Sequence, residues 1–441
     1  MTNKNYDFTL EHSFHGEFWQ DINNNQGRFS AKIEYTPYNG LILDYCISDS
    51  KSPTSCKRLY GILNSGVPCT LIGNFDFNHG GFTWGNGVRV LTGRHHFQVL
   101  IFNGFHDEKD SIEYCNLALH GMQEFMHPQG FITQLKHSST PLLTAQSKDW
   151  KIDIVNTATF GMVGDGLINV VNCNDEAALE KFNEDFTSTK TAFPGAIFSL
   201  RKNLKFYFRY ASSSHLDILL NINELMKMSG LFSILMDKPV IPEELYIKFV
   251  SDTKNHPCLF SNGMEQRTID LALTEISHHF LPLNWKQLDI ATILTNWFTI
   301  SENFTSLSVT YLNETGYRTL HQAHADIILY ATQLESINNS LGGKSSTKYT
   351  GPIDKYAPKI IKLKLETIFK NFNSNDLGKN IADLRNELAH VGRPKILMAK
   401  MKINDYVEIG LCLKVVVTSH LLSCLGLSDD QIEKYQQRVT N

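Results

Sequence analysis

Three polar side chains near the C-terminal end of the chain could act together on a phosphodiester. Arg385, Asn386 and His390 lie within one short segment that ends at Gly392. The planar guanidinium of arginine pairs with two phosphate oxygens, and histidine exchanges a proton near neutral pH. Arg385 is therefore predicted to stabilise charge on a phosphate, and His390 to act as general acid or general base. Asn386 would orient either His390 or the phosphate.

The segment that carries these residues has the apolar pattern of a helix packed on a core. Its apolar stripe consists of Leu377, Ile381, Leu384 and Leu388. Asn386 and His390 are four residues apart and share another face. Arg385 and His390 are five residues apart, so on an ideal helix they would point about 140° away from each other. One helix could not easily direct both at one atom, whereas a groove between two copies could, and we therefore predict a homodimer.

Glycine, proline and basic residues follow the motif directly. Gly392 is expected to supply a left-handed helix cap and Pro394 to block continuation, which would put His390 in the last turn. The helix dipole favours a protonated imidazole there. The basic residues are Arg393, Lys395, Lys400 and Lys402. Such a run is usually a solvated surface, but beside this motif it also predicts a patch that binds a nucleic-acid backbone in a salt-dependent way.

The elements that must position the motif divide the chain into a β-rich front and a helical back. Alternating apolar and polar residues at Phe29–Tyr35 are typical of a half-buried strand. The predicted segments are a β-rich region over 1–212, divisible into lobes at 1–145 and 146–212, a helical connector over 213–283 and a helical bundle over 284–434. Helices in the connector are expected at Leu216–Met236, Pro242–Phe249 and Gln266–Phe280. The predicted fold class is α+β, with a sandwich or open barrel-like sheet followed by an all-α bundle.

The sequence from Arg385 to His390 resembles the R-x4-H signature of HEPN domain ribonucleases, and the whole layout resembles the ApeA-type HEPN proteins of bacterial anti-phage defence. The resemblance implies that 284–434 is the HEPN domain and that two protomers pair so that both copies of Arg385 and His390 line one cleft. It implies metal-independent cleavage of RNA to products with a 2′,3′-cyclic phosphate and a 5′-hydroxyl. It also implies a phage-derived trigger that acts through the β-rich half, with tRNA as a candidate substrate.

Composition limits the other function classes. A net charge of -4 does not suit a nucleic-acid coat protein, so RNA would need a local basic patch. Eight scattered cysteines without a C-x-x-C pair, and an N-terminus without an apolar signal core, predict a cytoplasmic protein. The apolar stretch 409–427 is interrupted by Lys414, which favours a buried helix over a membrane span. No cofactor and no metal is expected, because Gly343-Lys344-Ser345 lacks the rest of a phosphate-binding loop and His321 with His324 lacks a third ligand.

Four alternative interpretations stay open at this point. Arg385 could pair with a carboxylate on a neighbouring helix and have only a structural role. The bundle could be a non-catalytic dimerisation unit, with a front half that binds a phage or host protein. The aromatic residues of the front half, such as Trp19 and Trp84, could form a glycan-binding surface. The mixed cations and aromatics of Lys205–Tyr210 occur in single-stranded nucleic-acid binders, although an alternating half-buried strand explains them better.

Overall fold

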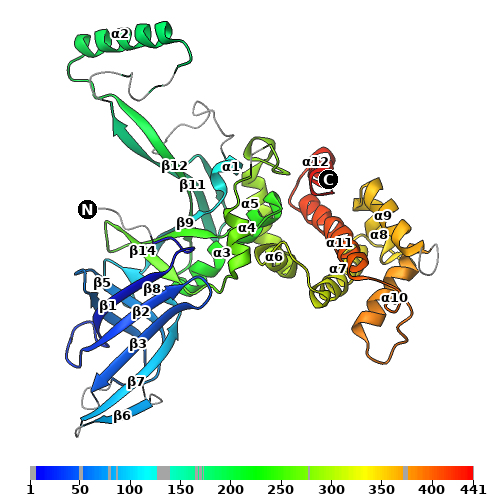
Figure 1. Ribbon diagram of the computed structural model, residues 1–441, viewed down its shortest axis with the longest axis horizontal. Helices are drawn as coiled ribbons and strands as arrows, with labels where there is room; N and C mark the ends of the chain where they lie inside the picture. The colour runs from blue at the N-terminus through cyan, green and yellow to red at the C-terminus, as the bar shows by residue number, and fades with distance from the viewer. Residues whose placement is uncertain are drawn as a thin grey trace.

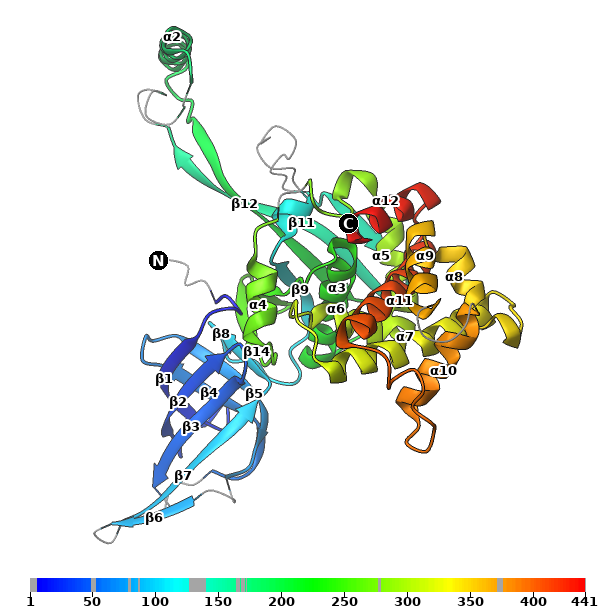
Figure 2. The same cartoon turned by 45° about the vertical axis from the view of Figure 1, so that its right-hand side comes forward.

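The computed structural model describes residues 6–48, 53–77, 81–85, 88–126, 140–163, 167, 171, 173–276, 279–370 and 376–440. These residues form one antiparallel sheet of 14 strands and a C-terminal group of helices. Figures 1 and 2 show the strands on one side of the molecule and the C-terminal helices α5 to α12 on the other. The predicted α+β class is confirmed.

The first eight strands form the barrel-like part of the sheet. They are β1 (His12–Trp19), β2 (Phe29–Thr36), β3 (Gly40–Ser48), β4 (Cys56–Leu63), β5 (Pro68–Phe75), β6 (Gly81–Gly85), β7 (Val88–Phe97) and β8 (Val99–Phe102). The sheet curls so that Gln98, just beyond β7, donates its backbone N–H to the carbonyl of Ile72 in β5 at 2.9 Å. Gly73 permits this approach, because a Cβ there would lie 2.5 Å from the Cβ of Phe97. The strand predicted at Phe29–Tyr35 is β2, and its apolar residues are buried.

The remaining strands extend the sheet away from the barrel. They are β9 (Ile112–Leu119), β10 (Leu143–Gln146), β11 (Trp150–Met162), β12 (Ser199–Ser212), β13 (Pro242–Phe249) and β14 (Asn255–Phe260). Their order is β10-β11-β12-β9-β13-β14, and β14 pairs with β8 to join the two parts. The long β11 and β12 form an arm that carries helix α2 (Glu176–Ala192) at its tip (Figure 1).

The prediction of a helix at Pro242–Phe249 is wrong, because this segment is strand β13. It pairs with β9 on one side and β14 on the other, so its backbone groups are satisfied inside the sheet. Its buried residues Leu245, Ile247 and Phe249 recur with the period of two that a strand requires. The segment predicted as a helical connector therefore contributes two strands to the sheet, and its flanking helices are α3 (Ile218–Met236) and a short α4 (Gln266–Leu273).

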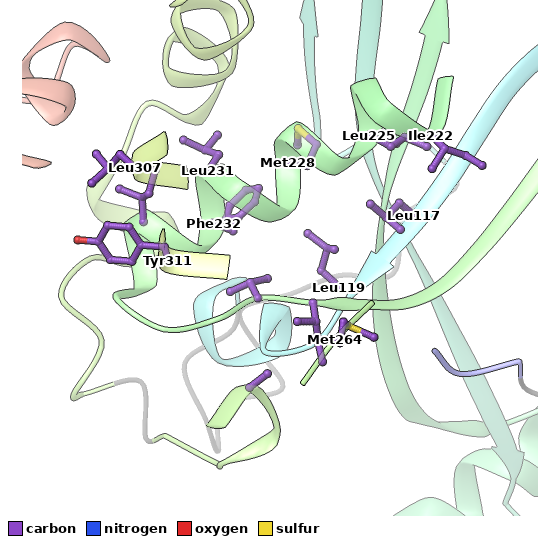
Figure 3. Packing of buried hydrophobic residues seen from close by; sticks show 14 of the residues in the cluster. Leu117, Leu119, Ile222, Leu225, Met228, Leu231, Phe232, Met264, Leu307 and Tyr311 are labelled. Atoms are coloured by element: carbon purple, nitrogen blue, oxygen red, sulfur yellow. The ribbon is translucent and has the colours of Figure 1, made fainter. Parts of the chain in front are cut away.

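Helix α3 connects the sheet with the C-terminal helices. Phe232 of α3 contacts Phe208 of β12 at a ring-centroid distance of 4.9 Å, and Figure 3 shows α3 side chains lying against Leu117 and Leu119 of β9. At its other side, the Trp297 indole donates to the carbonyl of Lys227 at 2.8 Å. The Tyr435 hydroxyl donates to the carbonyl of Ile234 at 3.0 Å. The buried helix α3 therefore packs both against the sheet and against the C-terminal helices.

The C-terminal helices pack around a central, largely buried helix. They are α5 (Ile290–Ile300), α6 (Thr305–Leu312), α7 (Leu320–Ser340), α8 (Thr350–Tyr356), α9 (Lys359–Lys370), α10 (Leu377–Ala389), α11 (Ile403–Cys424) and α12 (Asp429–Thr440). The central helix is α11, which contacts α7, α8, α9 and α12. The helical bundle predicted here is confirmed, and its N-terminal and C-terminal boundaries remain predictions.

Two helices in the described part of the chain, α3 and α11, have the length and apolar content of a membrane span. Both are core helices here, with 67% and 72% of their most apolar windows buried. Lys414, in the middle of α11, lies 3.9 Å from the Glu314 carboxylate and 4.0 Å from that of Asp237. Such ion pairing is expected for a charge inside a protein core.

Candidate active site

Helix α10 carries Arg385 and Asn386 and is anchored as its apolar pattern predicts. The Asp376 side chain caps its first turn by accepting from the backbone N–H of Lys379 at 3.0 Å. The residues of the stripe that are fully buried are Leu377, Ile381 and Leu384. Leu388 is half-buried against the same core. The helix contacts α7 and α9, so both candidate side chains project from a packed element.

The end of α10 differs from the prediction. The helix ends at Ala389, and His390 is the capping residue with an extended backbone at φ -121° and ψ 118°. Gly392 is not among the described residues with positive φ, so it is not a left-handed cap. Instead, the Lys395 ammonium binds the carbonyls of Glu387 and His390, the latter at 2.9 Å. A cation on the last carbonyls stabilises this end of the helix, and the extended backbone of His390 directs the chain away from the helical path.

Arg385 lies half-buried beside Asn386. Its Nη1 donates to the Asn386 Oδ1 at 3.2 Å, and its Nε is buried without a hydrogen-bond partner among the described residues. No ion pair within 4.0 Å joins Arg385 to a carboxylate in the described part of the chain. The two side chains form an arginine and carboxamide pair that presents donors without a resident anion.

One carboxylate on α7, that of Glu335, is influenced by the charge of Arg385. This carboxylate already accepts from the Lys348 ammonium at 2.9 Å and from the Tyr349 hydroxyl. Burial opposes the shift, but these two hydrogen bonds and the charges of Lys348 and Arg385 together lower the pKa of Glu335. Glu335 therefore interacts with Arg385 only weakly and through space, because its hydrogen bonds go to Lys348 and Tyr349.

His390 does not meet Arg385 within one chain. Its side chain is exposed, and its imidazole makes no hydrogen bond to the described residues. The structure thus brings Arg385 and Asn386 together and leaves His390 at the start of an exposed loop. A second chain could supply the missing partner for either group.

Glu387 is a residue of this site that the sequence reasoning missed. It is 5% exposed, and its carboxylate accepts from the backbone N–H of Leu397 at 2.9 Å and of Met398 at 3.0 Å. The Tyr406 hydroxyl donates to the Met398 carbonyl at 3.3 Å. Together these contacts fix the far end of the loop that begins at His390. The sequence does contain a signal for this buried role: a glutamate lies three residues after Leu384, at a position where the apolar stripe predicts an apolar residue.

The basic residues of the predicted patch have different environments. Lys395 caps α10, as described above, so its charge is engaged by carbonyl oxygens. Arg393, Lys400 and Lys402 are exposed, and Lys402 lies at the start of α11. Two apolar side chains of the same loop are also exposed, Val391 at 99% and Ile396 at 56%. The loop thus combines a histidine, cations and uncovered aliphatic groups.

The surroundings of the other candidate binding and metal-ligating residues indicate structural roles. Trp19 is buried and its ring contacts Phe105 at a centroid distance of 5.5 Å, so it does not form a recognition surface. The Trp84 side chain lies outside the described residues. His324 packs edge-on against the Tyr406 ring at 4.5 Å, and no group of three metal-ligating side chains occurs in the described part of the chain. Burial and the nearby His321 lower the pKa of His324.

Comparison with known protein families matches both parts of the chain. Residues 13–297 match the model described as ApeA N-terminal domain 1, and residues 314–431 match the model described as Apea-like HEPN. The second range contains Arg385, His390 and the basic residues as far as Lys402. HEPN domains are a family of metal-independent ribonucleases. Neither a curated protein nor a solved structure matches the chain.

Proposed function

The chain belongs to the ApeA family of HEPN-domain proteins, and from that premise we propose that it is a metal-independent endoribonuclease of bacterial anti-phage defence. The observation that carries the proposal is the state of Arg385. Its guanidinium is held by Asn386 and has no carboxylate within 4.0 Å among the described residues. An arginine oriented on a helix without an anion is suited to bind one, and a phosphodiester presents two oxygens to its planar fork.

The two candidate groups divide the chemistry of RNA cleavage. Arg385 stabilises the negative charge that accumulates on the phosphorane. The ribose 2′-oxygen loses its proton to a general base and forms a bond to phosphorus, and the bond from phosphorus to the 5′-oxygen breaks. A general acid protonates that oxygen, and His390 fills one of these two proton-transfer roles. The products carry a 2′,3′-cyclic phosphate and a 5′-hydroxyl.

The active unit in this proposal is a homodimer. Within one chain His390 is exposed and separate from the Arg385 pair. The same loop exposes 99% of Val391 and 56% of Ile396, which two copies would cover by packing loop to loop around a twofold axis. Pairing of this kind would complete the cleft by placing the groups of both copies along it. RNA would then follow the exposed cations Arg393, Lys400 and Lys402.

Sequencing of RNA ends tests this function. Phage-infected bacteria that carry the wild-type protein or the His390→Ala variant would be compared with a chemistry that captures cyclic-phosphate ends. We expect new ends only with the wild type, and their sequence context would decide whether tRNA is the substrate. The matched control is His321→Ala, an exposed histidine on α7 that should leave cleavage unchanged. Identical end profiles for wild type and His390→Ala, with protection retained, would refute the nuclease.

The second candidate is a non-catalytic dimerisation protein. It is favoured by the same exposure of His390, since one chain alone does not contain a complete site. In that case His390→Ala would keep both dimerisation and protection from phage.

A further inference from the structure

A pocket of about 430 Å³ lies between helix α12 and the segment 279–287, which precedes α5. The Gln431 carboxamide of α12 donates to the carbonyl of Gln287, so the two walls are joined by a hydrogen bond. One wall belongs to the range that matches the ApeA N-terminal domain, and the other lies just beyond the HEPN match, which ends at residue 431. The pocket therefore lies where the two parts of the chain meet, a common place for small-molecule sites.

The size and the floor of this pocket suit a small organic molecule. Its volume is within the range of about 300–1,000 Å³ usual for small-molecule pockets. Leu281 and Pro282 are buried and line the pocket. They form an apolar surface on which a flat ring can lie and lose contact with water. The floor thus offers a place for a nucleobase.

Two cations without anion partners line the helical wall. Lys434 and Arg438 are four residues apart on α12, so their side chains share one face of the helix. Neither has an ion pair or a hydrogen bond within the described part of the chain. The adjacent Glu433 accepts from the Gln437 carboxamide at 3.2 Å, and no carboxylate occurs among the described residues that line the pocket. The lining therefore has two positive charges that it does not neutralise itself.

The carboxamides on the opposite wall have only donors left. Asn284 and Gln287 form the capping box of a short 3-10 helix. The Asn284 Oδ1 accepts from the backbone N–H of Lys286 at 3.2 Å, and the Gln287 Oε1 accepts from that of Asn284 at 3.3 Å. Both carboxamide oxygens are engaged, whereas neither NH2 group has a hydrogen-bond partner among the described residues. Cations and NH2 groups all donate, so this lining favours a ligand that is rich in acceptors and negatively charged.

The surroundings of the pocket disfavour a long polyanion. Asp429, Asp430 and Glu433 of α12 are exposed, so positive charge on this helix is confined to its C-terminal half. A strand of RNA needs cations along its whole track, because each phosphate carries a charge. A single phosphate group, in contrast, needs only the two cations of the pocket.

We propose that this pocket binds a nucleoside 5′-monophosphate. A phosphate monoester carries a charge of about -1.5 to -2 at pH 7, which matches the two cations. The Arg438 guanidinium pairs with two phosphate oxygens, and the Lys434 ammonium adds a point charge. The base lies on the apolar floor, and the two free NH2 groups donate to acceptors of the ribose or the base. This binding does not require RNA cleavage, so its test is independent of the nuclease.

Isothermal titration calorimetry on the full-length protein tests the proposal. The probes are the 5′-monophosphates of adenosine, guanosine, cytidine and uridine. We expect at least one to bind the wild type, and to bind Lys434→Ala and Arg438→Ala roughly tenfold more weakly or worse. Both residues are exposed, so both variants should fold. The matched controls Lys359→Ala and Arg28→Ala change exposed cations elsewhere and should bind as the wild type does.

Hydrogen exchange on the wild type locates the bound nucleotide without relying on a variant. We expect protection in α12 and in 279–287, and none in α10, which carries Arg385. The proposal is overturned if no nucleoside monophosphate binds, if both variants bind as tightly as the wild type, or if α10 is protected instead.

Inorganic phosphate and a single-stranded RNA oligonucleotide distinguish other sources of the same anionic group. Inorganic phosphate should bind more weakly than the preferred nucleotide, because it does not use the apolar floor. Equal affinities for phosphate and for every nucleotide would overturn the assignment of a nucleotide. The assignment would also be overturned by an oligonucleotide that binds through Lys434 and Arg438 when no mononucleotide does.

Discussion

The loop that begins at His390 should lose its rigidity when the Glu387 carboxylate is changed to a carboxamide. The carboxylate accepts from two backbone N–H groups: that of Leu397, shared between both oxygens at 2.9 and 3.1 Å, and that of Met398 at 3.0 Å. In Glu387→Gln one oxygen becomes an NH2 group, which opposes the backbone donors, and the negative charge is lost. A hydrogen bond to a charged group contributes about 1.5–3 kcal/mol, and Glu387 is only 5% exposed, so solvent screening is small.

We expect the loop to open more easily by about 2–3 kcal/mol. Since about 1.4 kcal/mol corresponds to a factor of ten, exchange protection of the Leu397 and Met398 amides should fall roughly 30- to 150-fold. Hydrogen exchange with fragment-level resolution measures this directly. The matched control is Glu366→Gln, an exposed residue of α9, which should leave both amides protected.

We expect Glu387→Gln to lower the kcat of RNA cleavage, because the variant displaces His390 without changing the exposed cations. Unchanged protection of both amides would refute the assignment of Glu387 as the residue that positions the loop. Lost protection with full cleavage would show instead that the position of the loop does not matter for the chemistry.

Three further predictions concern pH, salt and assembly. Burial and, to a smaller extent, a neighbouring imidazole lower the pKa of His106 from 6.5 to about 4. The folded state therefore favours the neutral imidazole, so its contribution to stability is complete above pH 6.5 and is lost as the pH falls toward 4. Urea titrations should show wild type losing about 3 kcal/mol relative to His106→Gln across that window. The double variant Arg393→Ala with Lys402→Ala should reduce the salt slope of single-stranded RNA binding by about 0.7 per lost phosphate contact, measured by anisotropy. Val391→Glu should convert a dimer into monomers by mass photometry, whereas Val250→Glu, at a position 65% exposed in the front half, should not.

Local pattern alone determined where the site helix lies and which face it buries. The apolar stripe through Leu384 is a property of adjacent turns, and the structure buries it as predicted. The alternation in Phe29–Tyr35 likewise requires only that one face of a strand meets a core. Patterns of this kind are short-range, so they can be recognised without knowing what packs against them.

Tertiary partners decided the segments where short-range signals were ambiguous. Pro242–Phe249 contains residues compatible with a helix, but β9 and β14 satisfy its backbone, and β9 lies more than a hundred residues earlier in the chain. The end of α10 likewise depends on a residue outside the helix, although a near one, because the ammonium of Lys395 folds back onto the carbonyls of Glu387 and His390 in place of a glycine cap. Such a contact cannot be predicted from the spacing of residues within the helix, because the side chain that makes it lies outside the helix.

The chemistry of the site divides in the same way. The residue types of Arg385, Asn386 and His390 already indicated a phosphate ligand and a proton-transfer group. The five-residue spacing also indicated that Arg385 and His390 would not meet on one helix. The structure added that Arg385 pairs with Asn386 and that His390 lies on an exposed loop, which Glu387 holds in place. The reason is that a side chain's chemistry belongs to the residue, whereas its direction depends on the backbone, and the backbone at the end of α10 is held by hydrogen bonds with residues 395 to 398.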